Sequence, residues 1–261
     1  NSSAASDVYK RQLISCVPNQ RNLTFLFFFS VLLPNVLFSQ NFLKTSGRNI
    51  INQNGDTIVL RGIGLGGWMV QEGYMMAPGG FSGTQFQIKD KITDLIGEEE
   101  TEKFYDNWLK NHVRKIDIDS MKSWGFNLVR VPIHYNLFTA PIEDELFPGS
   151  YTEIEKGYKL LDSLLEWCKA NEMYMMIDLH AAPGGQGYDQ GISDYDTSKP
   201  SLWESNENKQ KMVALWGKLA ERYKNEEWIG GYDILNEPNW NLNGSEIKNL
   251  YVQVTNAIRA H

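Results

Sequence analysis

Cysteine is nearly absent from this chain, which has two, Cys16 and Cys168, among its 261 residues. Two such distant cysteines cannot build a disulfide framework or a cysteine-rich metal site. An excess of positive charge is also missing, because 25 basic residues face 32 acidic ones and the formal net charge is −7. A surface that binds phosphate needs the opposite balance. The composition therefore argues against a nucleic-acid partner and suits a protein that meets uncharged ligands.

Long apolar runs are lacking except near the N-terminus. There, Arg21 precedes an apolar stretch that closes near residue 40, the pattern of a secretory signal peptide. Pro34 interrupts the stretch, which is short for a membrane span. We expect a poorly defined leader at 1–22, a signal-peptide apolar region at 23–40 and one catalytic domain at 41–261. The protein would then be secreted, without a stable membrane span after cleavage; a retained N-terminal anchor is the alternative.

Apolar and aromatic residues, by contrast, are plentiful. Hydrophobic residues make up 42% of the chain and aromatic residues 12%, so the chain can bury a core and disorder is excluded. Most of the 8 Trp and 12 Tyr side chains should lie in that core. The remainder suit sugar rings, whose apolar C–H faces stack on aromatic side chains.

Strand and helix patterns alternate through the domain. Short apolar runs, typical of strands buried on both faces, occur at 57–63, 128–133, 174–179 and 228–235. Helical spacing predicts helices at 85–96, 98–114, 116–124, 154–170, 208–223 and 245–261, the last with Ser245 as N-cap and Glu246 in its first turn. This alternation predicts an α/β fold around a parallel sheet. Four βα units cannot close an eight-stranded barrel, so either the sheet is open or the sequence is incomplete.

Polar side chains stand where the predicted strands end. Arg130 lies on the second strand, His180 closes the third, and Asn236 and Glu237 close the fourth. An acid on the rim of a parallel sheet can protonate a leaving oxygen while the neighbouring Asn holds a substrate hydroxyl. Each residue also has a structural interpretation: a turn for Asn-Glu-Pro, an ion pair for the buried Arg130, and a satisfied core position for His180.

A metal-dependent hydrolase is an alternative for the third strand. Asp178 and His180 lie two residues apart and therefore on the same face. The remaining histidines, His112, His134 and His261, supply no matching pair, and we expect no metal.

Four segments in order, each at a predicted strand end, resemble glycoside hydrolase family 5 over roughly residues 42–261. The most specific pieces are the strand-two Arg, the DLH of strand three and the LNEP of strand four. The third segment resembles the subgroup of exo-β-1,3-glucanases and related β-glucosidases. The segments are RGIGLGGW (61–68), GFNLVRVPIHY (125–135), MMIDLHAAPGGQG (175–187) and GGYDILNEPNW (230–240).

The resemblance implies a (β/α)8 barrel, of which this chain holds about the first four βα units. It implies retaining hydrolysis of a β-linked oligo- or polysaccharide by two glutamates, without metal or cofactor. Glu237 would be the acid/base, and Arg130, His134, His180 and Asn236 would bind substrate, Asn236 through the sugar 2-hydroxyl. The family's nucleophile lies on strand seven, so we expect a C-terminally truncated chain that is inactive alone. A non-catalytic carbohydrate-binding barrel is the alternative.

Overall fold

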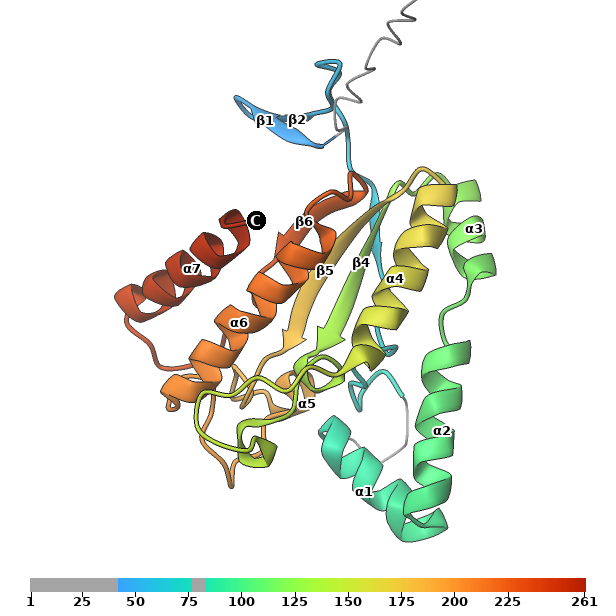
Figure 1. Ribbon diagram of the computed structural model, residues 1–261. Coiled ribbons are helices and arrows are strands. Elements are labelled where there is room, and N and C mark those ends of the chain that lie inside the picture. The colour runs from blue at the N-terminus through green and yellow to red at the C-terminus, as the bar shows by residue number, and fades with distance from the viewer. Residues whose placement is uncertain (1–41, 77–82) are drawn as a thin grey trace, which may run out of the picture. The chain divides into compact units, whose positions relative to one another are not determined.

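A parallel sheet forms the centre of the fold (Figure 1). The computed structural model describes residues 42–76 and 83–261, so the predicted leader and signal region lie outside the described residues. Within these residues, a four-stranded sheet has the order β3-β4-β5-β6, and every neighbouring pair is parallel. The strands are β3 (Gly62–Gly64), β4 (Leu128–His134), β5 (Tyr174–Ala181) and β6 (Ile229–Asp233). Sequential parallel strands joined through helices confirm the predicted barrel-type α/β fold.

The two central strands are buried on both faces. On one face, Val129, Val131 and Ile133 of β4 and Met175 and Ile177 of β5 are completely buried. On the other face, Leu128 and Pro132 of β4 and Asp178 and His180 of β5 are buried as well. Side chains alternate between the faces of a strand, so burial on both sides explains the nearly continuous apolar runs. The β4–β5 register runs from Leu128 opposite Tyr174 to Ile133 opposite Leu179, which brings the carboxyl ends of the two strands level.

Helices surround the sheet at the predicted positions, with ends within a few residues of expectation. Helices α3, α4 and α6 run alongside the strands, and α7 lies next to α6 (Figure 1). None of the helices within 42–76 and 83–261 is long and apolar enough to cross a membrane. The helices are α1 (Gln85–Ile96), α2 (Glu98–Asn111), α3 (Lys115–Ser123), α4 (Glu155–Ala170), α5 (Gln190–Ser193), α6 (Asn206–Tyr223) and α7 (Gly244–Arg259), with 3₁₀ turns η1 (Tyr135–Leu137) and η2 (Ile142–Asp144).

The expected N-cap of the last helix was wrong. The cap of α7 is Asn243, whose side-chain oxygen accepts hydrogen bonds from the main-chain N–H groups of Ser245 and Glu246. Glu246 reaches back to the N–H of Asn243 at 3.1 Å and completes a capping box. The helix therefore starts at Gly244 because Asn243 satisfies the first free N–H groups.

The first strand of the sheet is shorter than predicted, because only 62–64 of the expected 57–63 pair in it. Thr57 instead bridges to Ile51, at the end of a small antiparallel hairpin of β1 (Lys44–Ser46) and β2 (Asn49–Ile51). The side chain of Asn127 then accepts from the N–H of Arg61 at 2.7 Å and donates to the carbonyl of Val59 at 2.9 Å. The N–H of Arg61 and the carbonyl of Val59 are thus hydrogen-bonded to a side chain, so the hydrogen-bond ladder between β3 and β4 begins only at Gly62.

A buried ion pair fastens the loop between β4 and α4 to α6. The side chains of Lys211 of α6 and Glu145 of the loop are 2% and 3% exposed and are hydrogen-bonded to each other. Thr152 adds hydrogen bonds from its N–H and hydroxyl to the Glu145 carboxylate. Burial alone would raise the pKa of Glu145, but the hydrogen bonds from Lys211 and Thr152 outweigh it and lower the pKa to about 2. The pair thus contributes stability at neutral pH that is lost as the pH falls toward that value.

Replacing Lys211 by Met should destabilise the fold by about 3–5 kcal/mol, because it leaves the Glu145 carboxylate buried without a cation. Lys218→Met is the matched control on the same helix, since Lys218 is 49% exposed and should change stability by less than about 0.5 kcal/mol. The free energy of unfolding, measured by urea denaturation, checks both values. Equal effects of the two substitutions would contradict a buried, stabilising role for the pair.

Candidate active site

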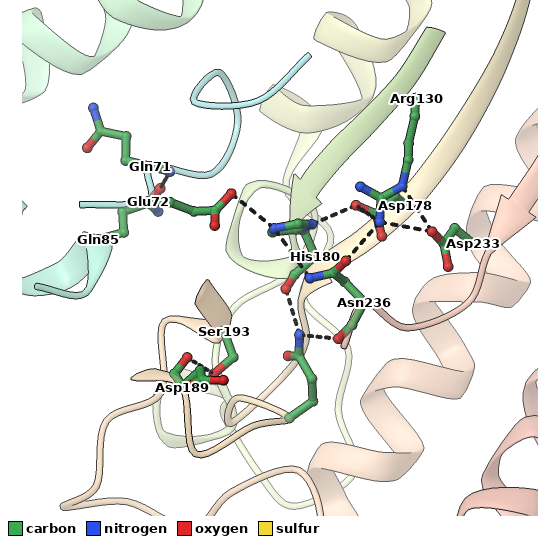
Figure 2. A network of polar contacts seen from close by, with 11 residues as sticks. Gln71, Glu72, Gln85, Arg130, Asp178, His180, Asp189, Ser193, Asp233 and Asn236 are labelled. Atoms are coloured by element: carbon green, nitrogen blue, oxygen red, sulfur yellow. Dashed lines mark hydrogen bonds and ion pairs between the residues drawn. The ribbon is translucent and has the colours of Figure 1, made fainter. Parts of the chain in front are cut away.

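Three of the predicted polar residues, Arg130, His180 and Asn236, converge into one network (Figure 2). Arg130, from β4, donates from Nη2 to Asn236 Oδ1 at 2.8 Å and from Nε to Asp233 Oδ2 at 3.0 Å. Its Nη2 also lies 3.0 Å from Oδ2 of Asp178, whose side chain is completely buried. Because the strands are parallel and in level register, side chains from β4, β5 and the end of β6 meet at one edge of the sheet.

His180 lies between two carboxylates in this network (Figure 2). Its Nδ1 is 2.7 Å from Asp178 Oδ2, and its Nε2 is 3.2 Å from Glu72 Oε1. Burial lowers the pKa of His180, but the hydrogen bonds to Asp178 and Glu72 outweigh it and raise the pKa to about 9. His180 is therefore an imidazolium at neutral pH, a buried positive charge between the carboxylates of Asp178 and Glu72.

Glu72 is a site residue that the sequence reasoning missed. Its side chain is 5% exposed and lies in the segment that follows β3, facing His180. The available signal was an acidic residue in the GGWMVQEG stretch, just after the carboxyl end of a predicted strand. Tyr74 follows in the same segment, and burial and then the charges of Glu72 and Glu237 raise the pKa of its hydroxyl. The Tyr74 hydroxyl therefore interacts electrostatically with both carboxylates.

Glu237 lies four residues beyond the last residue of β6, Asp233, and is exposed to solvent. It follows Asn236, which is 6% exposed and whose N–H donates to the carbonyl of Leu179 at 3.0 Å. The φ angle of Glu237 is +40°, a left-handed conformation that costs a non-glycine residue of the order of 1 kcal/mol or more. The carboxylate is accessible while its flanking residue is anchored.

His134 is not drawn into this network. It is 3% exposed, and its Nε2 pairs with Asp194 Oδ2 at 2.9 Å. The other oxygen of Asp194 accepts from the N–H of Phe86 in the first turn of α1 at 2.9 Å. These residues line a separate polar cavity of about 540 Å³. In this geometry His134 ties three segments together, and its contact with substrate stays a prediction.

The metal alternative has no support in residues 42–76 and 83–261, where no group of three or more His, Cys, Asp or Glu side chains is placed to hold an ion. Asp178 and His180, the pair that suggested it, hydrogen-bond to each other. The same carboxylate oxygen also meets Arg130. Both side chains are engaged in ion pairs within the network.

The model of the family described as "Cellulase (glycosyl hydrolase family 5)" matches residues 82–261. The chain belongs to glycoside hydrolase family 5. A β-xylosidase of Phanerodontia chrysosporium is 37% identical over 76% of this chain and 39% of its own length. Glucan 1,3-beta-glucosidase 2 of Candida albicans is 32% identical over 75% of this chain and 42% of its own length. The chain spans less than half the length of these two curated relatives.

Solved structures agree on the fold of this family 5 chain. Rutinosidase from Aspergillus niger matches with a TM-score of 0.60 and 17% identity, over 77% of this chain and 59% of its own. An endogalactoceramidase matches with a TM-score of 0.54 and 17% identity, over 84% of this chain and 50% of its own. At this identity the likeness concerns the fold alone.

The charge of His180 leads to a test by NMR. The imidazole should titrate with a pKa of about 9, and its contribution to stability should be complete below about pH 6.5 and be lost as the pH rises through 9. Asp178→Asn should lower that pKa because it removes the nearest negative charge. Asp94→Asn, at an exposed position of α1, should leave it unchanged. A wild-type His180 that titrates below 6.5 would contradict the ion-pair network.

Proposed function

We propose that this family 5 protein is a retaining β-glycosidase that cleaves β-glucans, with Glu237 as its acid/base. The observation that carries the proposal is an exposed Glu237 directly after Asn236, which is hydrogen-bonded to Arg130 of the Arg130–Asp178–His180–Glu72 network at the carboxyl edge of a parallel barrel sheet. Catalytic groups of barrel enzymes occupy this edge. Relatives that are named glucan 1,3-β-glucosidases support β-glucans as the substrate class.

Each residue has a chemical task in this proposal. Glu237 donates a proton to the glycosidic oxygen as the bond to the sugar breaks, and then takes a proton from the attacking water. Asn236, whose Oδ1 accepts from Arg130 at 2.8 Å, has its amide nitrogen 3.4 Å from His180 Nε2 and uses this nitrogen as the donor to the sugar 2-hydroxyl. Glu72, next to the imidazolium of His180, accepts a hydrogen bond from another sugar hydroxyl. Arg130 and His180 offset the negative charge of the carboxylates around the sugar.

Retention requires a second carboxylate about 5 Å from the acid/base. We expect this nucleophile on strand seven of the barrel, so residues 1–261 alone should be inactive. Secretion belongs to the same proposal, and the signal-like sequence of 23–40 supports it.

An aromatic pair beside Glu237 favours a sugar chain as the ligand. The rings of Tyr188 and Trp240 stack at 4.1 Å with an interplanar angle of 13°. Tyr188 is 52% exposed, and its N–H donates to the carbonyl of Asn239 at 2.9 Å, so it is anchored to the segment that follows the acid. An exposed ring in this place can stack on the apolar face of a sugar next to the scissile bond.

Replacing Glu237 by Gln in the complete gene product should reduce hydrolysis of a natural β-glucan about 10²–10⁴-fold, because the leaving oxygen loses its proton donor. With a dinitrophenyl β-glycoside the first step should survive, and a burst of dinitrophenol should precede slow turnover. Azide should restore turnover and give a β-glycosyl azide, since a small anion needs no general base.

The control is Glu221→Gln, an exposed carboxylate on α6, which should keep wild-type rates. If Glu237→Gln abolished the burst, Glu237 would be the nucleophile or a structural residue. A wild-type protein that binds glucans but hydrolyses neither substrate would instead be a carbohydrate-binding barrel.

Tyr188→Ala should raise the KM for β-linked oligosaccharides by about 2- to 13-fold, because a lost stacking contact is worth about 0.5–1.5 kcal/mol. The KM for a small aryl β-glycoside should change less than that for the longer chains. Initial-rate kinetics on a series of oligosaccharides of increasing length checks this. An equal increase for all substrates would argue against a sugar platform.

A further inference from the structure

Gln186 has a side chain that is completely buried and has every side-chain hydrogen-bonding atom engaged by main-chain groups. Its amide nitrogen donates to the carbonyl of His180 at 2.7 Å and to the carbonyl of Asn236 at 2.9 Å. Its amide oxygen accepts from the N–H of Ala182 at 3.1 Å. The partners of one side chain are thus the backbones of two site residues and of the loop that follows β5.

The two carbonyls lie where the ladder between β5 and β6 comes to an end. The paired register closes with Asp178 opposite Asp233, and the N–H of Asn236 still donates to the carbonyl of Leu179. Beyond this point the carbonyls of His180 and Asn236 are both acceptors and cannot satisfy each other. The NH₂ group of an amide offers two donors, so Gln186 adds a further link between the strand ends.

The carbonyl of Asn236 belongs to the peptide group that joins Asn236 to Glu237. A hydrogen bond to this carbonyl therefore restrains the peptide plane that precedes Glu237. The left-handed φ of +40° at Glu237 is the rotation that directly follows this plane. A strained residue keeps its conformation only where its surroundings hold it. The direction of the Glu237 side chain follows from that conformation.

The loop that carries Gln186 is itself held tightly. Gly184 and Gly185 both have a φ of +78°, and a Cβ at Gly185 would come within 2.6 Å of the Tyr195 side chain. The carbonyl of Gly185 accepts from the N–H of Leu202, and the carbonyl of Gln186 accepts from the indole of Trp203 at 2.9 Å. The amide of Gln186 therefore acts from a fixed position.

We propose that Gln186 is the positioning residue of the acid/base: it holds the Asn236–Glu237 peptide so that the Glu237 carboxyl points at the glycosidic oxygen. This rests on the proposed function, since it assigns a task only if Glu237 is the proton donor. Gln186 touches neither substrate nor reacting atoms and acts through the main chain.

The test compares Gln186→Glu with Gln190→Glu in the complete gene product. Both make the same chemical change in the segment that follows β5, but Gln190 is exposed, whereas a buried Glu at 186 supplies at most one donor, when protonated, for the two carbonyls. The readout is kcat/KM for an unactivated β-linked oligosaccharide divided by kcat/KM for a dinitrophenyl β-glycoside. This ratio is independent of the fraction of folded enzyme. It falls when acid assistance is lost, and a fall that is also present in the ratio of the two kcat values excludes weaker binding of the longer substrate as its cause.

Gln186→Glu should lower the ratio by about 10- to 100-fold, the range for a misplaced acid, and Gln190→Glu should leave it unchanged. A ratio equal to that of wild type, or equal losses with both substrates, would overturn the proposal. If Gln186→Glu does not fold, Gln186→Asn, which retracts the NH₂ group by one methylene, should lower the ratio in the same direction.

A second readout separates this proposal from the proposed function. The backbone amide signals of Asn236 and Glu237 in a ¹⁵N–¹H spectrum should shift in Gln186→Glu and not in Gln190→Glu. If wild type hydrolyses neither substrate, the proposed function fails. The positioning of Glu237 by Gln186 is then decided by these signals alone, and unchanged signals would overturn it.

Discussion

The pairing of Arg130 with the buried carboxylate of Asp178 is the interaction on which the site depends. An Arg inside an apolar strand needs a partner, and a carboxylate with no solvent exposure needs a cation. Once these two meet across β4 and β5, the same Asp178 oxygen orients His180, and the same guanidinium orients Asn236. The charge of His180 in turn requires the second carboxylate, Glu72.

The site combines buried charged side chains, held in place by one another, with an exposed carboxylate, Glu237. The side chains of Asp178, His180 and Glu72 are buried, that of Arg130 is partly exposed, and Glu237, the proposed acid/base, is exposed. Links through main-chain carbonyls allow this combination, because Gln186 can restrain the peptide before Glu237 without covering its side chain. Such links suit a group whose reactivity would suffer from direct hydrogen bonding.

Sequence reasoning placed the elements well where one physical pattern dominated. The apolar runs of β4 and β5 and the stripe of α4 are unambiguous because both strands are buried on two faces and the helix on one. It failed at 57–63, where a β-branched run looked like a strand, because the side chain of Asn127 occupies the backbone groups. Periodicity does not report on a partner that lies more than sixty residues away.

The sequence by itself determined the fold class and placed Arg130 on a strand and His180, Asn236 and Glu237 near strand ends, because polar groups after buried runs mark one edge of a parallel sheet. Only the tertiary structure decided which of them meet. His134 turned toward Asp194, and Glu72 and Gln186 joined the site. These outcomes depend on loop paths, which pack by side-chain contacts between distant segments and leave no period in the sequence.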